Sequence, residues 1–180
     1  MLMIIMGVLL WSGVHFFKRL MPAQRAAMGD KAKLMVTVGS FAALALMIIG
    51  YRAAPVEFLW QMPPWAIPLN NLLMLIAIFL VGMSATTGRL RGKLRHPMLL
   101  GTVVWSVAHL MVNGDTASVV LFGGMGLWAL IQMALVNRAG PWNRPDPGTA
   151  KKDIVLVVIT VVMFAVITII HGLIGPSPFG

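Results

Sequence analysis

The chain has 180 residues, of which 59% are hydrophobic and only 11% are charged. Charged side chains are too few to cover the surface of a globule of this size in water. The composition therefore excludes a soluble domain and indicates a membrane protein. The net charge of +9 comes from Lys and Arg placed between apolar runs, which indicates membrane topology and not a nucleic-acid surface. The absence of cysteine excludes disulfides, thiolate metal ligands and cysteine nucleophiles.

Apolar runs of membrane-spanning length follow one another along the whole chain. A helix needs roughly 20 residues to cross the hydrocarbon core of a bilayer. The first run has no positively charged start and no cleavage site, so we expect it to be retained in the protein. The pattern predicts an all-α, polytopic membrane helix bundle, a single domain over residues 1–180, with about six transmembrane helices at residues 1–17, 34–51, 66–85, 97–112, 117–136 and 154–174. The Asn113-Gly114 pair after the fourth run predicts a tight reversal with positive φ angles.

The basic residues are distributed unevenly among the connections between these runs. All but one of the 14 Lys and Arg residues lie in the first, third and fifth connections, and only Arg52 lies in the second. Cytoplasmic loops carry the excess of Lys and Arg in membrane proteins. We therefore expect these three connections to be cytoplasmic and both termini to lie on the non-cytoplasmic face.

All four histidines lie within the predicted spans or at their edges: His15, His96, His109 and His171. Ionisable side chains at membrane depth are costly, so they are functional candidates by default. His109 shares a helix face with Trp105, Ser106 and Asn113, and we expect this polar stripe to point into the bundle. His96 precedes Pro97, which suits the first position of a helix. A hydroxyl residue stands three positions before each of the other three histidines and is predicted to orient its ring: Ser12, Ser106 and Thr168.

The depths of these histidines decide which imidazoles can share a ligand. With a rise of about 1.5 Å per residue, His15, His109 and His171 lie at about 9, 18 and 26 Å from the cytoplasmic boundary. His109 is the central one and can pair with either of the others. Imidazoles from separate helices are the usual way to hold haem iron where cysteine is absent. A zinc site is a poorer interpretation, because there is no HExxH motif and no carboxylate within any span.

Two segments of the chain, with their spacing, resemble a known family. They are Arg95-His96-Pro97-Met98-Leu99-Leu100-Gly101, and the later Trp105, Ala108-His109 and Asn113-Gly114-Asp115. In order and spacing they resemble the NnrU family of membrane proteins. The resemblance extends over essentially the whole chain, through Gly13-Val14-His15, Phe122-Gly123-Gly124 and Ile170-His171-Gly172.

The resemblance implies a cofactor and a set of site residues. The family includes bacterial proteins associated with denitrification and nitric-oxide metabolism, and it is similar to the plant 15-cis-zeta-carotene isomerase, a membrane enzyme that uses haem b. It implies haem b with His15 and His109 as axial ligands to the metal, with further cofactor-binding candidates at His96, His171, Ser106 and Asn113. The isomerase has a cysteine at the position of Ser106, so haem binding carries over more directly than isomerase activity.

Several functions stay open for a haem protein of this type in a bacterial inner membrane. They are redox chemistry, isomerisation of a small hydrophobic substrate, and binding of a gaseous ligand such as nitric oxide. The alternative is a non-enzymatic accessory or assembly protein in the lipid bilayer, whose histidines make interhelical hydrogen bonds. A solute channel would need a continuous polar path, and only the fourth predicted helix has a polar stripe of that kind.

Overall fold

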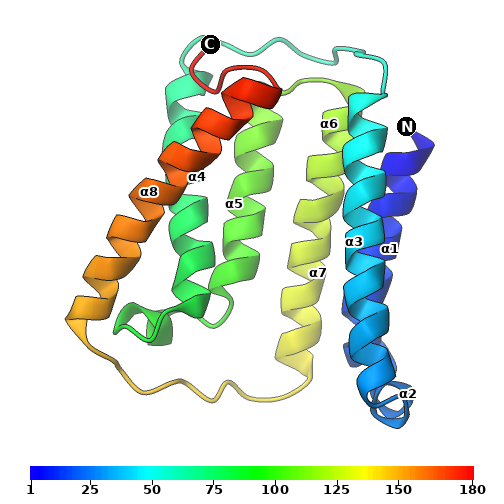
Figure 1. The fold of residues 1–180 in the computed structure, drawn as a ribbon, viewed down its shortest axis with the longest axis vertical. Helices are drawn as coiled ribbons and strands as arrows, with labels where there is room; N and C mark the ends of the chain where they lie inside the picture. Colours follow the sequence, from blue (N-terminus) through cyan, green and yellow to red (C-terminus); the bar gives the residue numbers. More distant parts are fainter. The chain divides into compact units, whose positions relative to one another are not determined.

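The computed structural model describes residues 1–180 and is all-α, as the sequence predicts (Figure 1). A 3₁₀ turn at Leu90–Lys93 precedes α5, and a π-helical turn at Val119–Gly123 joins α6 to α7 in one continuous helix, Thr116–Arg138. The α-helices are α1 (Leu2–Leu20), α2 (Pro22–Ala27), α3 (Asp30–Arg52), α4 (Ala66–Ala85), α5 (Pro97–Val112), α6 (Thr116–Ser118), α7 (Gly124–Arg138) and α8 (Ala150–Ile174).

Five of these helices are long and apolar enough to cross a membrane: α1, α3, α4, the continuous α6–α7 helix and α8. The chain is therefore an integral membrane protein. Helix α5 has the predicted bounds, but its 16 residues make it shorter than the other five. The structure thus confirms five of the predicted spans by length and composition, and the sixth stays a prediction.

The helices pack as two compact units, which are described separately here. Unit 1 comprises Met1–Trp60 and Gly114–Gly140, and unit 2 comprises Gln61–Asn113 and Pro141–Gly180. Unit 1 therefore holds α1, α2, α3, α6 and α7, and unit 2 holds α4, α5 and α8. The predicted single domain over residues 1–180 stays a prediction.

In unit 1, α1 and α3 pack along their length through glycine contacts (Figure 1). A Cβ built on Gly7 would lie 2.9 Å from the carbonyl oxygen of Ala43, and one built on Gly50 would lie 2.9 Å from the amide nitrogen of Ile4. The contacts pair higher residue numbers in α1 with lower residue numbers in α3, so the two helices are antiparallel. On another side of α1, Gly124 of α7 faces Val8 at similarly close range.

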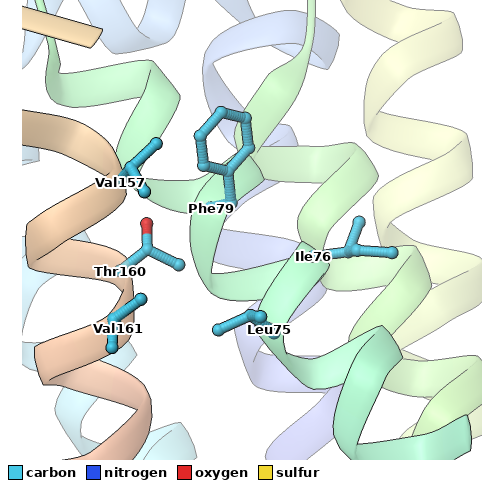
Figure 2. Close-up of a pocket in the computed structure, with 6 residues that line it drawn as sticks. All are labelled: Leu75, Ile76, Phe79, Val157, Thr160 and Val161. Atoms are coloured by element: carbon cyan, nitrogen blue, oxygen red, sulfur yellow. The ribbon is translucent and has the colours of Figure 1, made fainter. Parts of the chain in front are cut away.

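In unit 2, α4 packs against both α5 and α8. A Cβ built on Gly101 of α5 would lie 2.8 Å from the carbonyl oxygen of Ala77 in α4, so these two backbones are also in close contact. Figure 2 shows a pocket of about 190 Å³ between α4 and α8. Its lining is hydrocarbon apart from Thr160, whose hydroxyl donates to the carbonyl of Leu156. The lining residues are Leu75, Ile76, Phe79, Val157, Thr160 and Val161.

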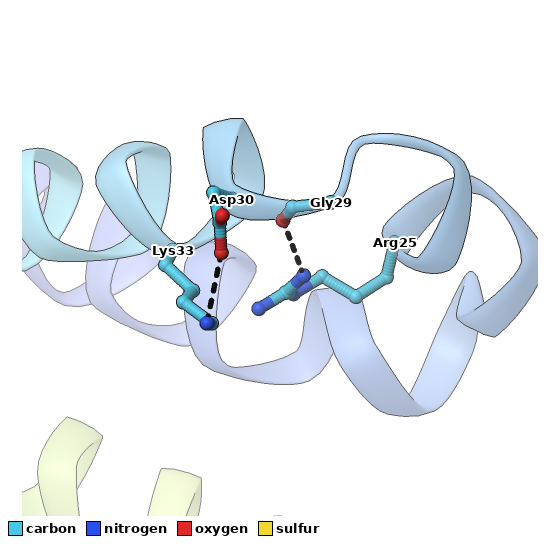
Figure 3. Close-up of polar contacts among 4 residues, drawn as sticks. All are labelled: Arg25, Gly29, Asp30 and Lys33. Carbon is cyan, nitrogen blue, oxygen red and sulfur yellow. Dashed lines mark hydrogen bonds and ion pairs between the residues drawn. The ribbon is translucent and has the colours of Figure 1, made fainter.

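The connection between α2 and α3 in unit 1 is held by two local polar contacts (Figure 3). Arg25 donates to the carbonyl of Gly29 at 3.2 Å, and Lys33 pairs with Asp30 at 2.8 Å. Gly29 has a φ of 53°, a conformation that glycine adopts without strain. Because the ion pair is exposed, it adds little to stability, and its carboxylate mainly complements the positive end of α3.

The chain that leads into α6 is fixed by hydrogen bonds within unit 1. The amide of Leu59 donates to the carbonyl of Gly114 at 2.6 Å, and that of Thr116 donates to the carbonyl of Glu57 at 3.0 Å. The predicted positive φ at Asn113-Gly114 is wrong, since Asn113 has a φ of −122° and Gly114 is not among the positive-φ glycines. Glycine is needed for close approach instead, because a Cβ on Gly114 would collide with the carbonyl oxygen of Trp60.

Asp115 caps α6 and links it to α3. Its carboxylate accepts from the Ser118 amide at 2.9 Å and from the Ser118 hydroxyl at 2.6 Å. Because that hydroxyl donates to Asp115, it accepts from Tyr51 of α3 at 2.8 Å. The capping carboxylate thus supports a contact between two helices of unit 1.

We expect the variant Asp115→Ala to lower the free energy of unfolding by about 1–2 kcal/mol, the usual cost of a lost N-cap. Denaturation in mixed detergent micelles with increasing SDS measures this change. Asp115→Asn is the matched control, because its amide oxygen still accepts from the Ser118 amide and should retain most of the stability. Equal losses in the two variants would contradict a capping role and point to the negative charge itself.

In unit 2, Asp153 of α8 holds the turn that follows α4. Its carboxylate oxygens accept from the amides of Arg89 at 3.1 Å and Leu90 at 3.2 Å. Arg144 donates to the carbonyl of Gly92 at 2.6 Å and attaches the segment before α8 to the same turn.

Asp153→Ala should release this turn at a cost of about 1–3 kcal/mol, because two amides lose their charged acceptor. Faster amide hydrogen exchange at Arg89 and Leu90 is the local measurement, while exchange in the middle of α4 should stay unchanged. Asp146→Ala is the control, because Asp146 is the acidic residue of the segment between α7 and α8. If exchange at the turn is the same in both variants, the Asp153 bonds do not hold it.

Candidate functional site

His15 lies in the second half of α1 and is held by the helix that carries it. Its Nδ1 lies 2.7 Å from the carbonyl oxygen of Trp11. A carbonyl oxygen can only accept, so Nδ1 carries the proton and donates, and Nε2 keeps its lone pair. The Trp11 indole stacks on the imidazole with centroids 4.2 Å apart, and Trp128 of α7 meets it edge-on at 5.4 Å. The ring is therefore fixed in orientation and in tautomer.

His109 in α5 of unit 2 has the same arrangement. Its Nδ1 lies 3.0 Å from the carbonyl oxygen of Trp105, and the Trp105 ring is tilted against the imidazole at 5.1 Å. Because Nδ1 carries the proton, Nε2 is again the unprotonated nitrogen. The side-chain amide of Asn113 donates to the carbonyl of His109 at 2.9 Å, which closes the end of α5. The predicted polar stripe thus forms, with Ser106 buried and His109 and Asn113 half-buried.

The two sites share a nine-residue pattern, Gly-x-x-x-Trp-Ser-x-x-His, which the sequence analysis missed. It covers residues 7–15 in α1 and residues 101–109 in α5. In both copies the glycine faces the carbonyl of an alanine on the neighbouring helix, Ala43 or Ala77. In both, the tryptophan four residues before the histidine supplies the carbonyl that accepts from Nδ1. A search for short repeats centred on the histidines would have found the pattern.

The predicted orienting role of the hydroxyl residues is wrong for two of the three histidines. The Ser12 hydroxyl donates to the carbonyl of Val8 at 2.7 Å, and that of Thr168 donates to the carbonyl of Phe164 at 2.9 Å. Hydroxyl groups within helices commonly bond back to the preceding turn in this way. Main-chain carbonyls orient the imidazoles instead.

The remaining two histidines occupy different positions in unit 2. His171 is exposed near the end of α8, where its Nδ1 donates to the carbonyl of Pro176 at 2.8 Å, and it lies close enough to His109 for an electrostatic interaction. His96 is the N-cap of α5, with φ of −128° and ψ of 54°, which confirms its predicted place before Pro97. It stands at the opposite end of α5 from His109, so the two do not share a site.

The donor set fits haem. Haem iron takes ligands from the protein, and neutral imidazoles with an unprotonated Nε2 are common ones. His15 in unit 1 and His109 in unit 2 both meet this requirement, and the carbonyl that accepts from Nδ1–H is the usual second interaction of a metal-binding histidine. His, Asp and Glu side chains form no cluster of three or more that could hold a bare metal ion. The apolar pocket of unit 2 contains none of the histidines.

Comparison with known proteins decides the family. The sequence pattern of the family described as NnrU protein matches residues 3–178. The chain belongs to the NnrU family. This match confirms the resemblance seen at the histidine segments and places both copies of the repeated pattern within the NnrU region. No curated protein and no solved structure matches the chain.

Proposed function

We propose that this NnrU-family membrane protein binds haem b through His15 and His109 and serves in redox chemistry. The observation that carries the proposal is the repeated arrangement of the two imidazoles. Each donates from Nδ1 to the carbonyl of a tryptophan one turn earlier and keeps the lone pair of Nε2. These two histidines, on two segments without carboxylates, would each supply a neutral imidazole ligand to haem iron.

The residues of the chain would each contribute a definable effect. The Trp11 and Trp105 carbonyls fix the tautomers and the ring orientations by accepting from Nδ1. The stacked indole limits rotation of His15, so less entropy is lost when the ring binds a ligand. The bound haem would supply one-electron chemistry or an iron site for a gaseous ligand. If both imidazoles hold the iron, the chemistry that the haem would supply is electron transfer, because His15 and His109 would occupy the ligand positions that a substrate or gas needs.

We infer a topology of six spans, with both termini on the non-cytoplasmic side of a bacterial inner membrane. Helix α5 packs along α4, and its 16 residues span about 24 Å, so modest thinning of the bilayer or the flanking residues complete the crossing. Six spans also place the three connections rich in Lys and Arg on one side. Labelling of the single-cysteine variants Phe58→Cys and Lys151→Cys tests this arrangement. Only the cysteine at position 58 should react with an impermeant reagent added from outside.

The direct test of haem binding is an absorption spectrum of the protein purified in detergent. We expect a Soret band and a pyridine haemochrome spectrum of b type, at one haem per chain. Reconstitution with haem should restore both in protein that was purified without it. Absence of a Soret band after reconstitution would overturn the proposal.

The competing function is that of an accessory membrane protein with structural histidines. It is supported by the fact that both Nδ1–H groups already bond within their own helices. In that case, alanine at His15 or His109 should lower the abundance of the protein without altering any spectrum or activity.

A further inference from the structure

Three buried polar atoms on α1 and α7 of unit 1 have no hydrogen-bond partner. They are the indole nitrogens of Trp11 and Trp128 and the amide oxygen of Gln132. Trp128 is only 7% exposed. Buried polar groups are nearly always bonded, and the hydrocarbon core offers no bulk water to bond them, so these atoms require an explanation.

The packing of α1 against α7 brings these groups to neighbouring levels. Gly124 lies against Val8, and the Trp11 and Trp128 rings meet edge-to-face at 5.5 Å. The residue numbers of these contacting pairs increase together in both helices, so α1 and α7 are parallel. One turn further along, His15 and Gln132 follow Trp11 and Trp128 on the same helix faces. Two N–H donors, an amide oxygen and the lone pair of His15 therefore lie on the adjoining faces of these two helices.

The chemistry of these groups defines the ligand. Residues 2–17 and 124–137 contain no Lys, Arg, Asp or Glu, so nothing there compensates a charged ligand. The ligand must accept from the two indoles and donate to the amide oxygen, and also to His15 Nε2 when that nitrogen is not bound to iron. A neutral hydroxylic molecule meets these requirements, and water, with two donors and two acceptors, meets all of them.

We propose that unit 1 contains a buried water site formed by Trp11, Trp128 and Gln132 next to His15. The site belongs to one copy of the repeated pattern only. The second copy contains Trp105, whose indole leaves no unpartnered buried N–H. The proposed water site therefore lies next to His15 and has no counterpart next to His109. The proposal does not depend on haem, because the three groups that form the site are not iron ligands.

Ultraviolet resonance Raman spectroscopy of the purified protein in lipid nanodiscs tests the site, because one indole band reports hydrogen bonding at N–H. The difference spectra between wild type and Trp11→Phe, and between wild type and Trp128→Phe, should each show the loss of a hydrogen-bonded indole. Gln132→Leu, which keeps every tryptophan, should move the two bands toward the unbonded position. The same change at Gln24, outside the site, should leave them unmoved.

A second measurement identifies the partner as water. With 5-fluorotryptophan incorporated, the two ¹⁹F resonances assigned by the Phe variants should shift on transfer from H₂O to D₂O, although both indole nitrogens are buried. Bands at the unbonded position in wild type, which is also the result expected if each N–H points at an aromatic face, would overturn the proposal. Bonded bands without a solvent isotope shift would overturn the assignment to water and indicate a partner that does not exchange with solvent. These results do not depend on the haem content, which the absorption spectrum proposed above measures separately.

Discussion

His15→Ala and His109→Ala should each reduce the affinity for haem by more than about 100-fold, which is the upper range for loss of a second-shell partner alone. The change removes a ligand to the iron and leaves the helix that carries it unbroken, since alanine favours the helical conformation. Haem content per chain after purification, together with the Soret position, measures the effect. Any haem that remains bound should show the spectrum of iron with a single imidazole.

The other histidines provide the matched controls for this experiment. His96→Ala changes the N-cap of α5, and His171→Ala removes an exposed ring bonded to the Pro176 carbonyl. Both variants should keep the wild-type spectrum. If His171→Ala removes haem and His15→Ala does not, then His109 pairs with His171, and the proposed pairing is wrong. Protein yield in micelles separates loss of haem from loss of fold.

Gly7→Ala and Gly101→Ala should each destabilise the protein by about 1–3 kcal/mol, the usual cost of overpacking. The new Cβ would lie 2.9 Å from the carbonyl oxygen of Ala43 in one case and 2.8 Å from that of Ala77 in the other. Neither oxygen can move without shifting its helix, so the backbones must separate. The steric cost should exceed the gain of about 1 kcal/mol in helix propensity. Unfolding with SDS in mixed micelles measures the difference.

Gly123→Ala is the control for this pair, because a Cβ built there meets no atom within 4 Å. It adds the same methyl group without a clash, so its stability should stay close to that of wild type. A loss in Gly123→Ala as large as in the other two variants would show that the glycines act through helix flexibility and not through close packing.

Hydropathy was sufficient to predict most of the helices. The predicted runs 66–85 and 97–112 are the observed bounds of α4 and α5, and the others differ only at their ends. Lys and Arg remain within several helix ends, which extends α3 to Arg52 and α7 to Arg138. The short helix α2 was not predicted, because its six residues carry neither a hydrophobic period nor a membrane-spanning length.

The candidate site was predicted in part. The histidines were identified because the predicted spans contain no Asp, Glu, Lys or Arg, but the hydrogen-bond partners of the histidines were not identified. Every residue within a helix has a main-chain carbonyl four residues before it. The side chains in the sequence therefore do not show whether that carbonyl or a hydroxyl three residues before the histidine accepts from its ring. The unpartnered atoms of Trp11, Trp128 and Gln132 depend on the packing of α1 against α7, which no local signal specifies.

The π-helical turn at Val119–Gly123 has a consequence for the residues beside His15. Such a turn holds an additional residue, and each residue of an α-helix advances the azimuth by about 100°. The additional residue changes the direction in which the following side chains face. Before the turn, Ser118 faces Tyr51 of α3, and after it, Trp128 faces Trp11 of α1. Deleting a single residue within the turn would leave the length of the span almost unchanged, yet it would rotate Trp128 away from the imidazole of His15. The position of Trp128 beside His15 is thus decided more than one turn away, by one additional residue in the π-helical turn.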